Sequence, residues 1–226
     1  MMTEETTGAL IMLCKRRSAM YGFLSCLFST EVTEDLLDEL IARRYPAATG
    51  SEKMNEGYRK MTRYLSNIWE DSCRDLAADF SRTFIGHGID AHAAAYPQES
   101  VHTGEKRLTM GNARTEVLAL YRSQGMRKET GWREDEDHVA VELDFMCIMA
   151  QRTAEALQAG DASDAESMLR VQGNFVADHF AWIPSLASQM RRFSKTDFYQ
   201  GLSLVTEGFA MVDREFLDEI NAENAA

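Results

Sequence analysis

The segment from Trp132 to Met146 carries the densest set of side chains that could do chemistry. Four consecutive carboxylates, Glu134 to Asp137, stand directly before His138, and Glu142 follows four residues later. Carboxylates at the start of a helix complement its dipole, and the aspartates of this run can cap free backbone N–H groups. Two interpretations stay open: a capped helix start with a surface His138–Glu142 pair, or a polar rim beside an apolar groove that suits a basic and apolar peptide.

Catalytic and metal-binding patterns are weak in this chain. His138 and Glu142 would supply only two metal ligands, without an evident third. Ser100 lacks the Gly-x-Ser-x-Gly elbow of hydrolases, and the chain has no phosphate-binding glycine loop. One stretch is rich in histidine, but its spacings of five and ten residues match no familiar ligand motif: His87, His92 and His102. We therefore expect no catalytic residue, no metal site and no cofactor.

The elements that must position these residues are all helical in pattern. Apolar residues recur at helical spacing, and neither alternating β-branched runs nor a hairpin signal occurs. The expected helices cover residues 10–28, 34–44, 51–69, 76–85, 105–122, 137–157, 163–183 and 197–220, with Pro184 bending or restarting the seventh. The fold class is therefore all-α: a single-domain helical bundle of about nine to ten helices over residues 1–226.

Two polar segments interrupt the helical pattern. Gly86 to Gly104 forms one long loop that starts at a glycine cap, and Gly125 to Glu134 forms a second. Long loops in compact domains are functional or disordered. Residues 86–104 and 125–134 are therefore candidate hinges, and a monomer and a domain-swapped dimer both stay open.

Composition limits the partners of the protein. The chain has 226 residues and a formal charge of −12, so it would repel a phosphate backbone, and nucleic acid is not an expected partner. An acidic surface attracts basic peptides weakly, although simple solubility explains the same charge. No run of 18 apolar residues occurs, which argues against membrane insertion, and the acidic start does not resemble a secretory signal. The cysteines lack C-x-x-C spacing, and Cys14, Cys26 and Cys147 are expected to be buried thiols suited to a reducing cytoplasm.

Six segments, taken in their order along the chain, resemble the TorD/DmsD family of redox-enzyme maturation chaperones, which includes relatives that serve nitrate reductases. The signature E-P-x-D-H-x-x-x-E-L-x-F-M is matched by Glu134 to Met146, with Asp135 where proline is usual. The P-x-E-S loop is matched by Tyr96 to Val101, with His102 where an aromatic residue is common. The other matching segments are Arg16–Phe28, Asp79–Gly86, Phe175–Pro184 and Phe198–Leu202.

The resemblance implies an all-helical cytoplasmic chaperone that is not an enzyme. Its expected partner is the apo-form of a molybdenum-cofactor oxidoreductase catalytic subunit, or the twin-arginine leader of that subunit. Such a chaperone holds the leader or N-terminal region until cofactor is loaded, before export or assembly. The expected peptide-binding residues are Glu136, Asp137, His138 and Glu142 in the signature, and Tyr96, Pro97, Glu99 and Ser100 in the loop.

Two other functions remain open. One is a small metal- or nucleotide-dependent hydrolase that uses the histidines, which metal analysis of the purified protein would reveal. The other is a structural adaptor that stays bound as a subunit of a redox complex. Stable co-purification with a mature, cofactor-loaded enzyme would support the adaptor.

Overall fold

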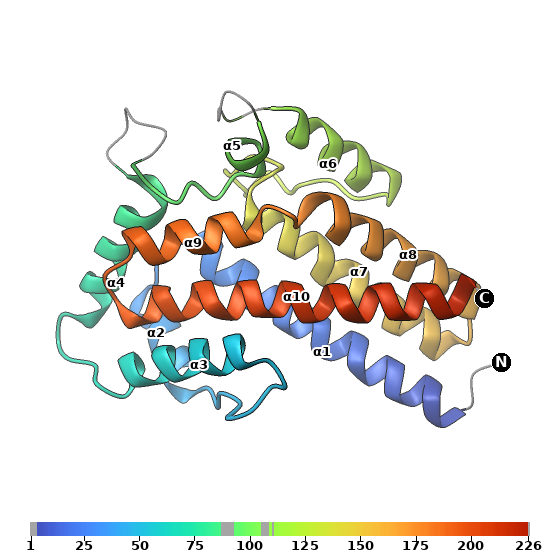
Figure 1. The fold of residues 1–226 in the computed structure, drawn as a ribbon, viewed down its shortest axis with the longest axis horizontal. Helices are drawn as coiled ribbons and strands as arrows, with labels where there is room; N and C mark the ends of the chain where they lie inside the picture. The colour runs from blue at the N-terminus through green and yellow to red at the C-terminus, as the bar shows by residue number, and fades with distance from the viewer. Residues whose placement is uncertain (1–3, 87–92, 105–108, 110, 226) are drawn as a thin grey trace. The chain divides into compact units, whose positions relative to one another are not determined.

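The computed structural model of this chain describes residues 4–86, 93–104, 109 and 111–225. Every regular element within these residues is a helix, so the predicted all-α class is confirmed (Figure 1). The helices are α1 Glu4–Ser29, α2 Glu34–Ala42, α3 Glu52–Leu65, α4 Ser72–Phe80, the π-helix η1 Ser81–Ile85, α5 Glu99–Thr103, α6 Asn112–Ser123, α7 Val139–Ala159, α8 Ala162–His179, α9 Ile183–Phe193 and α10 Asp197–Ala225.

The chain divides into two compact units. Unit 1 contains the described parts of Met1–Ser29, Arg114–Ala181 and Asp213–Ala226. Unit 2 contains the described parts of Thr30–Ala113 and Trp182–Val212. The organisation of residues 1–226 as one domain therefore stays a prediction.

Unit 1 is built on helix α7, which packs against both α1 and α8. Its core is aromatic: Phe145 of α7 lies 4.9 Å from the ring of Tyr121 and 4.8 Å from that of Phe175. The Ser25 hydroxyl of α1 donates a hydrogen bond of 2.8 Å to the Ala140 carbonyl. The start of α7 is therefore fixed both by core packing and by a direct polar contact with α1.

A buried ion pair crosses unit 1. The Arg17 guanidinium on α1 donates to both carboxylate oxygens of Asp213 on α10, at 2.5 and 2.9 Å. The Tyr21 hydroxyl donates to the same carboxylate at 2.7 Å, and all three side chains are almost fully buried. Bidentate pairing satisfies charges that would be costly to bury alone, so the pair fixes the register of α1 against the end of α10.

In unit 2, helix α3 and the first half of α10 approach very closely. A Cβ added to Gly201 would lie 2.5 Å from the Gly57 carbonyl oxygen, so only glycine fits at this crossing. The buried Asp79 carboxylate of α4 accepts from the backbone N–H groups of Lys195 and Thr196, immediately before α10 begins. The first half of α10 is therefore held both by backbone contact and by a side chain from α4.

Several local expectations are confirmed and three are corrected. The chain has a positive φ of 67° at Gly86 after η1, and Pro184 stands in the first turn of α9, as predicted. Helix α8 begins one residue earlier than expected, because the Asp161 carboxylate accepts from the Asp164 N–H and caps it. The segment expected as one long loop contains the short helix α5. Cys26, expected to be buried, is exposed.

Candidate functional site

The signature segment leads into α7 in unit 1, and the structure buries most of it. Asp137 and Glu142 have no exposed surface, and His138 is 5% exposed. The expectation that these three side chains form an exposed rim is therefore corrected, because the tight packing of α7 on its neighbours encloses them. Their involvement in peptide binding stays a prediction.

His138 is the N-cap of α7. Its Nδ1 accepts a hydrogen bond of 3.1 Å from the Ala140 N–H, and its carbonyl accepts from the N–H groups of Val141 and Glu142. Burial, and then the positive charge of Lys128, lower the pKa of His138 to about 4. The ring is thus neutral near pH 7, and because Nδ1 accepts, Nε2 carries the proton. The sequence pattern favours the aspartates for this capping role, but in the structure the imidazole performs it.

The carboxylates before His138 are balanced by cations from unit 1. Arg114 lies 2.5 Å from the Glu136 carboxylate and 3.8 Å from that of Asp135, and Lys128 lies 3.6 Å from Glu136. Burial opposes ionisation of Glu136, but the Arg114 hydrogen bond and the nearby cations lower its pKa. Lys128 also donates to the Glu134 carbonyl. Much of this acidic charge is therefore neutralised internally and ties the loop at Lys128 to the start of α7.

The four expected residues of the P-x-E-S segment lie together in unit 2. Pro97, Glu99 and Ser100 are buried and Tyr96 is half-buried. The Ser100 hydroxyl accepts a hydrogen bond of 3.0 Å from the Gly111 N–H, and a Cβ on Gly111 would lie 3.1 Å from it. This close approach indicates a packing role for Ser100.

His102 fills an aromatic position in unit 2. Its ring centroid lies 4.8 Å from that of Trp182. Its Nε2 lies 2.8 Å from the Tyr96 carbonyl oxygen and its Nδ1 lies 3.0 Å from the Ser185 hydroxyl. Histidine therefore keeps the ring contact that an aromatic residue would make and adds two polar ones. His87 and His92 lie outside the described residues, and among those described no cluster of three metal-ligating side chains occurs.

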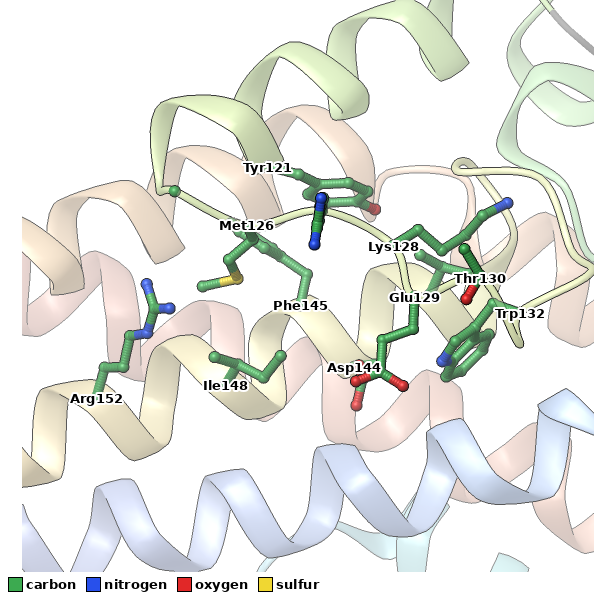
Figure 2. A pocket seen from close by; sticks show the side chains of 13 residues that line it. Tyr121, Met126, Lys128, Glu129, Thr130, Trp132, Asp144, Phe145, Ile148 and Arg152 are labelled. Atoms are coloured by element: carbon green, nitrogen blue, oxygen red, sulfur yellow. The ribbon is translucent and has the colours of Figure 1, made fainter.

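The sequence did not reveal an open cavity of about 760 Å³ in unit 1 (Figure 2). One wall is the loop after α6 and the other is a face of α7. The lining residues are Tyr121, Gly125, Met126, Arg127, Lys128, Glu129, Thr130, Trp132, Val141, Asp144, Phe145, Ile148 and Arg152. The α7 members recur at helical spacing, so this stripe was visible, but the sequence did not show that the loop leaves it uncovered.

Two groups in this cavity have distinct electrostatic settings. Burial, and then the neighbouring Glu129 carboxylate, raise the pKa of Asp144. Arg152, at the other end of the α7 face, donates a hydrogen bond of 2.9 Å to the Gln124 carbonyl. The cavity therefore combines apolar side chains with an acidic corner.

None of the helices in the described part of the chain has the length and hydropathy of a membrane span.

The chain is similar to known proteins over most of its length. The family described as nitrate reductase delta subunit matches residues 49–188. The chaperone protein TorD of Vibrio cholerae serotype O1 (strain ATCC 39315 / El Tor Inaba N16961) is 28% identical, over 93% of this chain and 96% of its own length. The TorD of Vibrio parahaemolyticus serotype O3:K6 is 26% identical, over 90% and 95% respectively. A solved structure of an Archaeoglobus fulgidus protein assigned to redox enzyme maturation covers 89% of this chain and 93% of its own, with 18% identity and a TM-score of 0.48.

The chain is all-helical in the residues that the structure describes, and it resembles chaperones of the TorD type over most of its length. More particularly, it belongs to the nitrate reductase delta subunit family, and the expected relationship to TorD-type chaperones is confirmed.

Proposed function

We propose that this protein is a cytoplasmic chaperone, and not an enzyme, that binds the leader or N-terminal region of a molybdenum-cofactor oxidoreductase subunit before export or assembly. The observation that carries the proposal is the cavity on α7, the helix that begins at the family's signature segment. A volume of about 760 Å³ is typical of sites that enclose a few side chains, so an extended segment suits it better than a folded domain.

The buried signature residues support this site by positioning it. His138 caps the helix that carries one wall, and Glu136 holds Lys128 of the opposite wall. Asp137 and Glu142 lie at the same helix start, so changes there act on the cavity through α7 and the loop. This is how we propose that Glu136, Asp137, His138 and Glu142 contribute to peptide binding.

The loop residues of unit 2 have a separate place in the proposal. Of Tyr96, Pro97, Glu99 and Ser100, only Tyr96 retains substantial exposed surface. We propose Tyr96 as the contact residue of this loop, with the other three shaping the backbone around it.

Ile148 offers a direct test of the cavity. Its side chain lines the cavity and is 36% exposed, so Ile148→Ser changes an accessible surface. Ile41→Ser on α2 is the matched control, because Ile41 is 40% exposed and lies outside the cavity. With the N-terminal peptide of a candidate client in calorimetry, Ile148→Ser should weaken binding about threefold to fivefold, because binding can bury only the exposed third of this side chain, worth roughly 0.5–1 kcal/mol.

The control and the wild type separate the outcomes. Ile41→Ser should bind like the wild type. If Ile148→Ser and Ile41→Ser bound the client peptide with equal affinity, the cavity would not be the binding site. If the wild-type protein bound neither the leader nor the N-terminal region of any molybdoenzyme encoded beside it, the chaperone function itself would have to be given up.

A further inference from the structure

The cavity in unit 1 has two chemically different ends. Figure 2 shows Glu129, Asp144 and Trp132 gathered on one side, with Met126 and Ile148 on the other. Phe145 lies between the two groups (Figure 2). One end is therefore acidic and aromatic, and the other presents apolar side chains beside Arg152, whose guanidinium donates to the Gln124 carbonyl.

The acidic end lacks a cation of its own among the described residues. Neither Glu129 nor Asp144 makes a side-chain hydrogen bond or ion pair with any residue that the structure describes. Lys128 is directed to the Glu134 carbonyl and to Glu136, and Arg127, which also lines the cavity, is exposed. Asp144 is half-buried and Glu129 is exposed; burial, and then the Glu129 charge, raise the pKa of Asp144, and a cation would relieve this repulsion.

We propose that this cavity holds one basic side chain of a bound peptide between Glu129 and Asp144, against the ring of Trp132, and a following apolar side chain on Met126, Phe145 and Ile148. The inference rests on the proposed function and deepens it by fixing which end of the cavity takes which kind of residue. Charge complementarity selects this occupant, because two carboxylates and an indole ring favour a cation.

Arginine suits this corner better than lysine. Its planar guanidinium pairs with carboxylates through several N–H donors, and it also stacks on an aromatic face. A cation over a tryptophan ring is the strongest of the cation–aromatic pairs. The apolar end then buries apolar side chains of the peptide that would otherwise stay in water. Binding therefore depends on the order of basic and apolar residues along the peptide as well as on its composition.

The test is a double-mutant cycle with synthetic peptides. One peptide has two adjacent arginines followed by three apolar residues, and its partner carries citrulline, a neutral isostere, at both arginines. The protein variant is Glu129→Gln with Asp144→Asn. Its control is Glu116→Gln with Glu155→Gln, which removes the same charge from exposed positions outside the cavity.

We expect the wild type to prefer the arginine peptide about tenfold in calorimetry, from partly exposed ion pairs and one cation–aromatic contact. The Glu129→Gln/Asp144→Asn variant should retain about a twofold preference or less. The control variant should keep the wild-type preference, because general attraction to an acidic protein does not depend on these positions.

Any of three results from the protein variants would overturn the inference. An unchanged preference in the Glu129→Gln/Asp144→Asn variant would remove the two carboxylates from recognition. If the Glu116→Gln/Glu155→Gln control lost the same preference for the arginine peptide, the effect would come from net charge alone. If sedimentation showed that the wild type is a dimer and the Glu129→Gln/Asp144→Asn variant is a monomer, the cavity would bind a second copy of this chain.

The proposed function is judged separately from this subsite. If the wild type binds a client's N-terminal region but shows no preference between the two short peptides, the chaperone function stands and the subsite is wrong. If it binds neither the client region nor the short peptides, both are wrong.

Discussion

His138 makes the stability of this protein depend on pH. The buried ring caps α7 in its neutral form, with Nδ1 accepting from the Ala140 N–H. Protonation would convert this acceptor into a donor facing an N–H group, in a buried site near Lys128. Lowering the pH should therefore destabilise the folded protein through this residue.

The magnitude follows from the two pKa values. The pKa of His138 is about 4 in the folded protein and 6.5 for an ordinary histidine. Because the folded pKa is the lower one, the unfolded chain binds more protons between these values, and stability falls as the pH drops through this window. The full stabilisation is present above pH 6.5, and about 2 kcal/mol of it is lost between pH 7 and pH 5.

Urea unfolding at pH 7 and pH 5 measures this loss. His138→Asn is the matched variant, because asparagine is a good N-cap and does not titrate. The wild type should lose about 2 kcal/mol more than His138→Asn over this range, since all other titrating groups are common to both. If both proteins lose the same free energy of unfolding, the assignment of His138 as a neutral buried cap is wrong.

Two further predictions concern the helix packing of each unit. Asp213→Asn should lower the free energy of unfolding, measured in urea, by about 3–5 kcal/mol, because it leaves the buried Arg17 cation without its charged partner. A loss under about 1 kcal/mol would show that this pair is not buried as described. Gly201→Ala should cost about 1–3 kcal/mol, because its Cβ would meet the Gly57 carbonyl oxygen. Gly8→Ala, whose Cβ meets nothing within 4 Å, should instead gain roughly 1 kcal/mol, and equal effects at both glycines would contradict the close crossing.

The order and type of the elements could be predicted from the sequence because helix formation depends on local pattern. Apolar residues at helical spacing marked α7 and α10, and Pro184 marked the restart at α9. The short α5 escaped notice because five residues are too few to display a stripe. The sequence alone does not fix the start of α8, because Asp161 and Ser163 are both good caps, and only the folded backbone shows which side chain reaches a free N–H.

The sequence by itself determined the all-helical class, the family and the place of the signature at the start of a helix. It could not show which of the signature's charges reach water, because Arg114 pairs with Glu136 from 22 residues away and α1 closes over the start of α7. Burial and ion pairing depend on which helices meet, and only tertiary structure decides that. The same packing left Asp144 and Glu129 at an open cavity while enclosing Asp137 and Glu142, although all four are carboxylates.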